Sequence, residues 1–443
     1  MANIQSKLGN PFVILIASFL ALIILGTYLL SLPGASEISG GLSFIDALFM
    51  STSAVCVTGL VVVTTGTDLT TFGQIITLIL IQIGGLGFMT LATMMAIIIG
   101  KKISFKDRLV LKEALNQESL HGILNLVKYI FFFTFISELI GALILTWRFS
   151  ALYNIKEAFY LGIFHSVSAF NNAGFDLFGN SLLNFNNDLI VQLTIVFLFI
   201  FGGLGFIVTL NIFQKKFKFG SFSLHSKVVI VTTILLLFFG TLAIFIFETT
   251  NYETLNSSFS ERLSTAFFQS ATARTAGFNT AEIRSMTLAT QFTLLSLMFI
   301  GASPGSTGGG IKTTTFATSF LVIRSVLKGQ EEIIVFKRTL PEDFIKRSFV
   351  IMLISFGTVL VSTTLLTLTE SFDFMSILFE SMSAFGTVGL TLGITSSLTF
   401  WGKLNIIFTM FLGRIGPLTL FFALSNKDKR SGFNYPEEKI MIG

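Results

Sequence analysis

A short glycine-containing phrase occurs four times in the sequence, and its residue types suit the binding of a small cation. Glycine accepts backbone dihedrals that other residues avoid, so a loop around it can turn carbonyl oxygens toward an ion. A ring of such carbonyls replaces the hydration shell of the ion without burying a full charge. No carboxylate lies inside the phrases, which favours carbonyl coordination over a ring of acids. The four copies are Cys56-Val57-Thr58-Gly59-Leu60, Asn171-Asn172-Ala173-Gly174-Phe175, Arg274-Thr275-Ala276-Gly277-Phe278 and Gly386-Thr387-Val388-Gly389-Leu390.

The spacing of the phrases separates two interpretations of these glycines. A single glycine is equally well explained by the close contact of two helices in a membrane. The four glycines recur at intervals of 115, 103 and 112 residues, each after a short stretch of Phe, Ser, Thr and Ala. Repetition in register indicates one structural unit used four times. We therefore expect four walls around a common axis.

The composition places the chain among membrane proteins. Of its 443 residues, 52% are hydrophobic and 12% are charged, whereas soluble domains carry about 25% charged residues. The formal net charge of +5 comes from basic residues in short loops between apolar runs, which indicates membrane topology and not nucleic-acid binding. Residues 11–32 form a run too long for the core of a signal peptide, so we expect a retained span. Cys56 is the one cysteine, so an internal disulfide is excluded.

The repetition predicts an all-α polytopic membrane protein with four span–pore-helix–span repeats around a pseudo-fourfold pore. Each repeat is expected to hold a span, a short helix that enters the membrane and turns back, the glycine loop and a second span. The short stretches are about 15 residues long and too polar to cross a bilayer. Irregular backbone at membrane depth is tolerated where it is buried or lines water. The predicted repeats are residues 11–110, 122–218, 225–328 and 345–425, followed by a cytoplasmic tail at 426–443.

A second glycine cluster follows each phrase and marks the second span. The third unit departs from the others, because its cluster contains proline and continues into three more glycines. Proline and glycine disfavour a helix interior, so this span is predicted to break midway into a loop. The clusters are Gly84-Gly85-Leu86-Gly87-Phe88, Gly202-Gly203-Leu204-Gly205-Phe206, Gly301-Ala302-Ser303-Pro304-Gly305 with its continuation to Lys312, and Gly413-Arg414-Ile415-Gly416-Pro417.

Basic residues determine the expected orientation. Clusters of lysine and arginine follow each second span, at 101–112, 215–227, 324–347 and 427–439. The positive-inside rule places these loops and both termini in the cytoplasm. The glycine phrases then open toward the outside. Acidic residues in the outer loops would raise the local cation concentration there, although each single acid is better explained as an ordinary solvated residue.

The phrases, the second glycine clusters, the broken third unit and Arg414 together resemble the superfamily of potassium transporters that includes bacterial Trk and Ktr proteins and plant HKT proteins. The resemblance covers about residues 11–425, and the run from Ser303 to Thr313 is quite specific to this superfamily. It is closest to the KtrB/KtrD-type membrane subunits. The chain starts directly on the first repeat, whereas Trk-type subunits carry extra N-terminal spans.

The resemblance implies a potassium-selective filter with a gate below it. Glycine at the position of Gly59 goes with potassium preference, whereas serine there marks sodium-preferring plant relatives. The loop at about 301–313 would be an intramembrane gate, with Arg414 near the same constriction. The implied filter residues, with K⁺ at their carbonyls, are Val57, Thr58, Gly59, Asn172, Ala173, Gly174, Thr275, Ala276, Gly277, Thr387, Val388 and Gly389. The implied gate residues are Gly301, Pro304, Gly305, Gly308, Gly309, Gly310, Lys312 and Arg414.

The resemblance also implies partners. The chain would form a homodimer with two separate pores in the bacterial cytoplasmic membrane. It would dock on a cytoplasmic ring of RCK-type nucleotide-binding subunits, similar to KtrA or KtrC. Sodium often stimulates or couples such systems. The chain itself has no Walker loop or nucleotide fingerprint, so we expect it to bind no cofactor beyond the transported K⁺ and, if coupled, Na⁺.

Charged residues near the phrases have two interpretations each. Arg414 lies deep in an apolar run, where it could act as a pore barrier or gate latch, or pair with a helix-end carbonyl. Lys312 could contact the gate or extend to the cytoplasmic face. Arg274 would repel potassium if it faced the pore, so we expect it to point away and pair with an acid behind the filter.

Other polar residues are also ambiguous. Asn171 and Asn172 could brace the second loop through their side chains or cap a helix. Glu380 could support the fourth loop from behind or lie at the edge of the bilayer. His165 is expected to be buried and hydrogen-bonded, because the three histidines show no metal-binding spacing.

Three other classes of membrane protein fit the sequence less well. A secondary transporter with broken helices would show two inverted halves, whereas these repeats share one direction; sodium coupling and a less selective monovalent cation channel stay open. A voltage-gated channel needs Arg-rich spans. An intramembrane enzyme needs paired catalytic groups or metal ligands inside spans. Neither pattern occurs, so the chain is not expected to be an enzyme.

Overall fold

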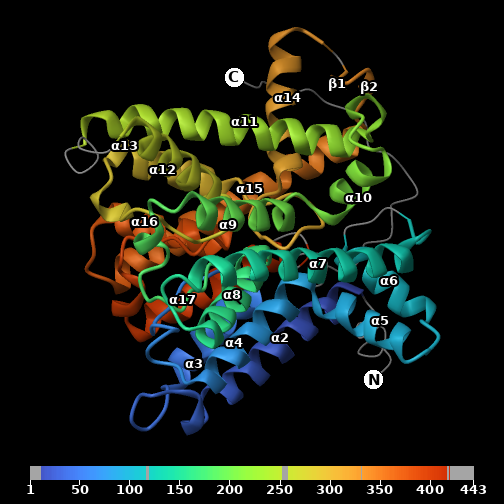
Figure 1. Ribbon diagram of the computed structural model, residues 1–443. Helices are drawn as coiled ribbons and strands as arrows, with labels where there is room; N and C mark the ends of the chain where they lie inside the picture. Colours follow the sequence, from blue (N-terminus) through green and yellow to red (C-terminus); the bar gives the residue numbers. More distant parts are fainter. Residues whose placement is uncertain (1–10, 116–118, 252–257, 331, 417–418, 420–443) are drawn as a thin grey trace.

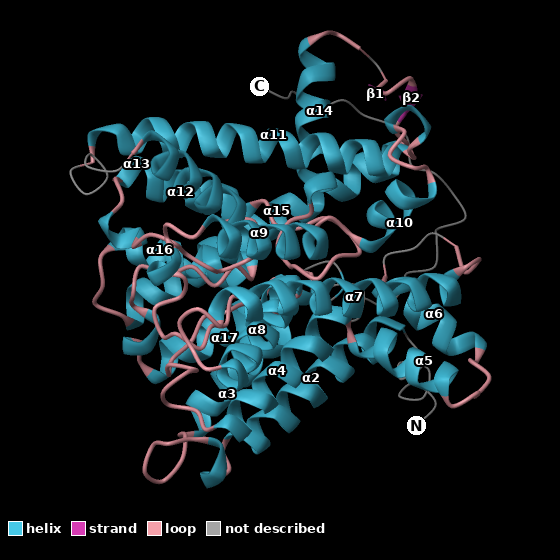
Figure 2. Cartoon of the chain, viewed as in Figure 1, coloured by secondary structure: helices cyan, strands magenta, loops and turns pink. Residues whose placement is uncertain are grey.

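The chain folds into a helical bundle in which four similar units follow one another. The structure is a computed structural model that describes residues 11–115, 119–251, 258–330, 332–416 and 419. Within these residues the strands β1 (Ile334–Val335) and β2 (Arg338–Thr339) form one short hairpin. Helices and loops make up the remainder, as Figure 2 shows. This is the all-α architecture predicted from the sequence.

Each unit begins with a long apolar helix. Each of these helices is long and apolar enough to cross a bilayer. Their exposed faces carry large apolar side chains such as Phe132, Phe238 and Leu353, which is the surface expected where lipid is the solvent. Figure 1 shows α11 along one side of the molecule and α2 along the opposite side. The four helices are α2 (Pro11–Leu30), α7 (Ile123–Phe149), α11 (Leu224–Phe247) and α15 (Glu342–Thr369).

Each unit continues with a short helix that ends inside the bundle, directly before or within a glycine phrase. These pore helices are α3 (Phe44–Cys56), α8 (Ile155–Phe170), α12 (Phe259–Thr272) and α16 (Phe374–Gly386). A polar residue caps each N-terminus by accepting a hydrogen bond from a backbone N–H of the first turn. The capping residues are Ser43, Asn154, Ser258 and Asp373.

Glycines on the first spans allow three pore helices to approach closely. A Cβ atom at each of these glycines would collide with a serine hydroxyl of the pore helix. The same hydroxyls donate hydrogen bonds of 2.6–3.2 Å to carbonyls three residues before the glycines. The facing pairs are Gly26 with Ser51, Gly141 with Ser166 and Gly240 with Ser270. The recurrence of this contact shows that the units share packing as well as sequence landmarks.

The end of each first span is tied to the start of the second span. In the fourth unit, Glu370 accepts hydrogen bonds from the backbone N–H and the hydroxyl of Thr399, at 3.2 and 2.6 Å. In the third, Glu248 accepts the equivalent pair from Thr287. The corresponding contacts in the first two units are Thr70 to the Gly34 carbonyl and Arg148 to Asp188. These ties close each unit around its pore helix.

The second spans of the first two units are sharply bent. Helix α4 (Thr71–Leu86) meets α5 (Phe88–Ile98) at 92°, and α9 (Leu189–Gly203) meets α10 (Phe206–Gln214) at 99°. The bends occur at Gly87 and Gly205, whose φ angles of +80° and +92° interrupt the helix. An interruption of the second span is therefore not confined to the third unit, where it was predicted.

The third unit differs in the length of its interruption. Helix α13 (Leu288–Phe299) and helix α14 (Thr313–Leu327) are separated by a loop of residues 300–312. In the fourth unit, α17 (Phe400–Ile415) ends at Gly416, with φ +87°. A further helix, α6 (Phe105–Ala114), connects the first two units. The predicted tail at 426–443 lies outside the described residues.

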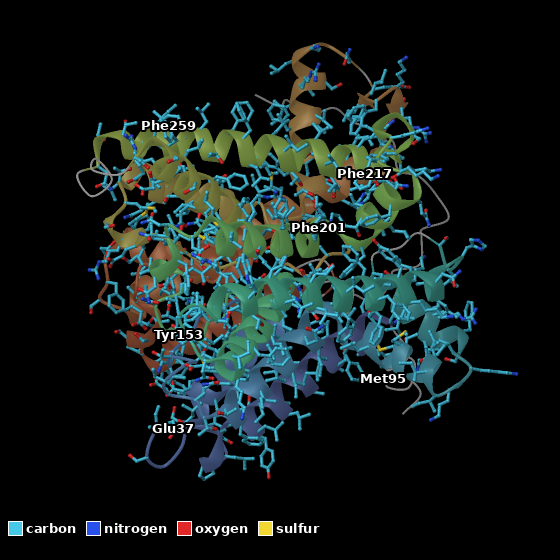
Figure 3. The ribbon with its side chains drawn as sticks, viewed as in Figure 1. Glu37, Met95, Tyr153, Phe201, Phe217 and Phe259 are labelled. Atoms are coloured by element: carbon cyan, nitrogen blue, oxygen red, sulfur yellow. The ribbon has the colours of Figure 1, made fainter. Side chains whose placement is uncertain are left out.

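All four units point the same way. In Figure 3, Glu37, Tyr153 and Phe259 lie at one end of the molecule. Each of them follows the first span of a different unit. Met95 and Phe217, which follow second-span bends, lie at the opposite end. The four glycine phrases therefore approach one another from a common side.

The packing of pore helices on glycines can be tested by one added methyl group. Gly141→Ala places a Cβ against Ser166 and Leu198, so we expect a loss of about 1–3 kcal/mol, as for overpacked cores. Gly357→Ala lies on another first span where nothing stands within 4 Å of the added atom, and it should gain up to about 1 kcal/mol. Thermal unfolding in detergent measures both. Equal melting temperatures for the two variants would contradict this packing.

Candidate ion-binding site

The four phrase glycines form a closed ring in the middle of the bundle. All four have positive φ angles, which are +90°, +68°, +78° and +91° for Gly59, Gly174, Gly277 and Gly389. A Cβ atom at each would meet the carbonyl oxygen of the residue before the next glycine. These oxygens belong in turn to Ala173, Ala276, Val388 and Thr58. Because the sequence of contacts returns to its start, the four phrases surround a single axis.

A second left-handed residue occurs two positions before each glycine. These residues are Val57, Asn172, Thr275 and Thr387, with φ angles between +49° and +84°. Alternation of right- and left-handed dihedrals turns successive peptide groups toward the same side of the chain, which is how short backbone segments form concave ion sites. Left-handed dihedrals are costly for β-branched residues, and three of the four are valine or threonine. The strain is held by the surrounding contacts at all four phrases.

Hydroxyl groups of the pore helices hold the glycine loops. In the first and fourth phrases, Ser53 and Ser383 accept hydrogen bonds of 3.1 Å from the N–H groups of Gly59 and Gly389. In the other two, Ser168 and Thr272 donate to the carbonyls that follow the glycine, at 2.7 and 2.6 Å. These residues were not predicted from the sequence, although a serine lies six positions before three of the glycines.

The C-termini of the four pore helices converge on this ring. Each helix carries a partial negative charge at its C-terminal end. The ring is therefore the place in the molecule where several helix ends and carbonyl groups favour a cation. Among the described residues, no group of three or more His, Cys, Asp or Glu could hold a metal ion. Backbone oxygens are thus the ligands that this site offers.

The loop of residues 300–312 packs directly against three of the phrases. The Gly309 N–H donates to the Thr387 hydroxyl at 3.0 Å. The Thr307 hydroxyl donates to the Asn172 side chain at 2.9 Å. A Cβ at Gly308 would collide with the hydroxyl of Thr275. The left-handed residues of the second, third and fourth phrases are thus all in contact with this loop.

The same loop is hydrogen-bonded to the ends of neighbouring second spans. The N–H groups of Ser303 and Thr307 donate to the carbonyls of Gly203 and Gly202, at 3.0 and 3.2 Å. The Gly305 carbonyl accepts from the N–H of Phe206 at 2.9 Å. These bonds satisfy peptide groups that cannot be hydrated at membrane depth. Other predicted gate residues lie in the same segment: Gly301 packs against Gly309, Pro304 approaches Gly205, and Gly310 donates to the Gly413 carbonyl at 3.2 Å.

Arg414 links the loop to the first unit. Its guanidinium donates to the carbonyls of Thr307 and Gly84, and to that of Gly85 at 3.1 Å. Gly84 and Gly85 lie at the C-terminal end of α4. The predicted contact of Arg414 with a helix end is therefore confirmed. The bond to Thr307 at the same time attaches the loop. The structure thus shows the helix-end contact expected for Arg414, and the same side chain also contacts the loop.

Lys312 also contacts the loop. Its ammonium donates to the Gly308 carbonyl at 2.7 Å and lies 3.5 Å from that of Gly309. The side chain therefore folds back onto the glycine run and does not extend to the surface.

Arg274 differs from its prediction. Among the described residues it forms no ion pair, and its nearest hydrogen-bond partner is the Thr233 hydroxyl at 3.5 Å. Its Nε atom is buried and has no hydrogen-bond partner among the residues that the structure describes. The expected acid behind the filter is absent there because the space around Arg274 is lined mainly by apolar residues of α9 and α11.

The remaining polar residues brace the loops. Asn171 caps α8, and its side chain donates to Gln82 and Glu138. Asn172 donates to Thr275 at 3.1 Å, linking two phrases. Glu380 is buried and accepts from the hydroxyls of Thr391 and Thr395, at 2.7 and 2.6 Å, behind the fourth phrase. His165 is buried, as expected, and its Nδ1 lies 2.7 Å from the Leu161 carbonyl.

One ion pair that was not predicted joins the fourth unit to the first. Lys403 contacts Asp46 at 2.6 Å, joining α17 to the start of α3. Relative to the N-cap residue of its second span, Lys403 occupies the position that Gln74, Gln192 and Gln291 occupy in the other units. Those glutamines donate to backbone carbonyls within their own units. In the sequence, this contact is indicated by a lysine in the fourth unit at the position where the other units have glutamine.

The bond between the fourth phrase and the loop predicts a difference between two threonines. Thr387→Val removes the acceptor of the Gly309 N–H, which should cost about 1–3 kcal/mol of unfolding free energy. Thr58→Val is the matched control, because the buried Thr58 hydroxyl has no hydrogen-bond partner among the described residues. Thermal unfolding in detergent should show a lower melting temperature for the first variant and an unchanged or higher one for the second. The opposite order would exclude the bond.

Comparison with known proteins agrees with this geometry. The family model described as "TrkH: Cation transport protein" matches residues 1–432. The chain is 43% identical over 435 residues to the Ktr system potassium uptake protein B of Bacillus subtilis, covering 98% of this chain and 97% of the relative. It is 40% identical over 440 residues to the potassium/sodium uptake protein NtpJ of Enterococcus hirae, covering 98% and 97%.

A solved structure shares the fold. The crystal structure of the potassium transporter TrkH from Vibrio parahaemolyticus matches with a TM-score of 0.74 and 20% sequence identity, covering 94% of this chain and 85% of that one. Together with the family match over nearly the whole chain, this agrees with the apolar spans and the absence of an enzyme signature. The chain belongs to the TrkH family of cation transport proteins, and it is a multi-pass membrane transporter and not an enzyme.

Proposed function

We propose that this chain takes up potassium across the cytoplasmic membrane of a bacterium, through a filter made by the carbonyls of the four glycine phrases. The observation that carries the proposal is the closed circuit of contacts among Gly59, Gly174, Gly277 and Gly389. The names of its relatives support the choice of ion, since three of them at 40–43% identity are described as Ktr system potassium uptake proteins.

Glycine at all four positions is what potassium preference requires in this proposal. Selection by carbonyls depends on the number and position of the oxygens around the ion. A side chain at Gly59 would displace the Ala173 carbonyl, and one at Gly277 would stand 2.5 Å from the Val388 oxygen. The filter residues are those predicted from the sequence, 57–59, 172–174, 275–277 and 387–389.

The loop of residues 300–312 is proposed as the gate. It contacts the second, third and fourth phrases, and Arg414 holds it to the first unit. Loops of this kind open when their anchoring bonds exchange. Lys312 and the glycines at 301, 305 and 308–310 give the loop its local hydrogen bonds and its conformational range.

Orientation and partners are part of the same proposal. The basic loops follow the second spans, so these loops and the termini are assigned to the cytoplasm. A cytoplasmic RCK-type nucleotide-binding ring would regulate a homodimer of this chain. The relatives' description as parts of a Ktr system supports a multicomponent assembly.

A second candidate is a less selective monovalent cation channel or a sodium-coupled transporter. The observation in its favour is the name of the Enterococcus hirae relative, a potassium/sodium uptake protein at 40% identity. In this alternative, sodium would use the carbonyl ring or stimulate transport through it.

Rubidium-tracer uptake into proteoliposomes separates these candidates. Wild-type uptake should be blocked by potassium and hardly by sodium. Gly59→Ser should lower the ratio of potassium to sodium potency about tenfold or more, which corresponds to ~1.4 kcal/mol. Gly40→Ser is the matched control, because Gly40 also has a positive φ but no atom within 4 Å of the added Cβ. Equal block of the wild type by both ions would contradict potassium selectivity and favour the second candidate.

A further inference from the structure

In the second, third and fourth phrases, the residue three positions before the glycine approaches the end of the preceding second span. Asn171 fills the space beside Gly85, at the end of α4. Arg274 lines a small cavity together with Gly203, which lies at the end of α9. Gly386 packs on the Met298 carbonyl, at the end of α13. This position therefore touches the places where the second spans break.

At the first of these places, a buried acid organises the contact. Glu138 on α7 is 6% exposed and accepts hydrogen bonds from Asn171 at 3.0 Å and from Gln82 at 3.2 Å. The Asn171 side chain also donates to Gln82 at 2.8 Å. Glu138 forms no ion pair among the described residues. A buried carboxyl without a basic partner is costly, and in membrane spans such residues usually serve function.

The network continues to the loop through Arg414. Gln82 lies on the last turn of α4, and the Asn171 side chain stands against Gly85. The carbonyls of Gly84 and Gly85 accept hydrogen bonds from Arg414, which also binds the Thr307 carbonyl. The Thr307 hydroxyl then returns to Asn172, the neighbour of Asn171. The second phrase, the end of α4, Arg414 and the loop thus form one closed circuit.

The equivalent place in the next unit lacks this network. The cavity beside Arg274 has a volume of about 20 Å³, enough for about one water molecule. Ile200 occupies the position of Gln82, and Leu237 occupies that of Glu138. Within the described part of the chain, the span-end carbonyls that Arg414 binds are those of the first unit. The hydrogen bonds of Glu138 and those of Arg414 therefore meet at the same span end, that of α4.

We infer that Glu138 is a positioning residue for the Arg414 latch, acting through Asn171 and Gln82 on the end of α4. This inference rests on the proposed role of the 300–312 loop as a gate. Loss of the carboxyl leaves the Gln82 side-chain amide without the acceptor that it has here and removes one of the acceptors of Asn171. The α4 carbonyls then shift relative to Arg414. The loop then opens more readily, while the glycine ring keeps its selectivity.

The test is a double-mutant cycle read by rubidium uptake into proteoliposomes that contain this chain alone. Glu138→Leu should raise uptake about threefold or more, as for coupled residues in one network. Arg414→Ala should also raise it, and the double variant should equal Arg414→Ala. Glu138→Gln keeps one of the two acceptor oxygens and should raise uptake less than Glu138→Leu does. Thr134→Val, one turn away on α7, removes a buried hydroxyl without a partner among the described residues and is the control.

The outcomes are distinct for the inference and for the proposed function. Additive effects of Glu138→Leu and Arg414→Ala, or no effect of Glu138→Leu where Arg414→Ala opens the pore, would overturn the inference alone. Changed block by sodium in Glu138→Leu would also overturn it, because the acid would then act on the filter. Gln82→Leu breaks the network from α4 and gives the same readout if Glu138→Leu does not fold. Rubidium uptake by the wild type that potassium fails to block would overturn the proposed function itself.

Discussion

The structure depends on the need to satisfy backbone groups that leave helical geometry at membrane depth. An unpaired peptide group costs several kcal/mol in hydrocarbon, so irregular backbone must be buried in protein or line a path for ions. Here four glycine phrases leave their helices together, and each stands against the carbonyl of the next. Pore-helix hydroxyls at Ser53, Ser168, Thr272 and Ser383 hold the loops from behind. In the proposed function, carbonyl oxygens of these loops coordinate the cation.

The same constraint explains the bent second spans and the long loop. The bends at Gly87 and Gly205 expose carbonyls at the ends of α4 and α9, and partners must approach them. The loop of residues 300–312 donates to those of α9, and Arg414 donates to those of α4. A broken span in one unit thus creates the attachment point for a loop from another. The glycine phrases, the bends and the loop form a single hydrogen-bonded assembly in which movement of one part changes the contacts of the others.

Much of this arrangement was visible in the sequence because glycine requirements leave a regular mark. The four phrases, the pore helices and the interruption at 301–312 all followed from glycine and proline at fixed spacing. The bends at Gly87 and Gly205 were missed, because glycines in an apolar run fit helix packing equally well. The partner of Arg274 was predicted wrongly, since burial of an arginine suggests an acid but does not supply one. Contacts between distant units, such as Lys403 with Asp46, depend on how the units close around the axis.

The most direct measurement is a structure of the protein in rubidium, with the anomalous signal used to locate the ion. The account predicts rubidium on the axis between Gly59, Gly174, Gly277 and Gly389, within coordination distance of backbone carbonyls from all four phrases. It also predicts no comparable peak beside Arg414. Rubidium bound elsewhere, or held mainly by side-chain carboxylates, would contradict a filter made of backbone carbonyls.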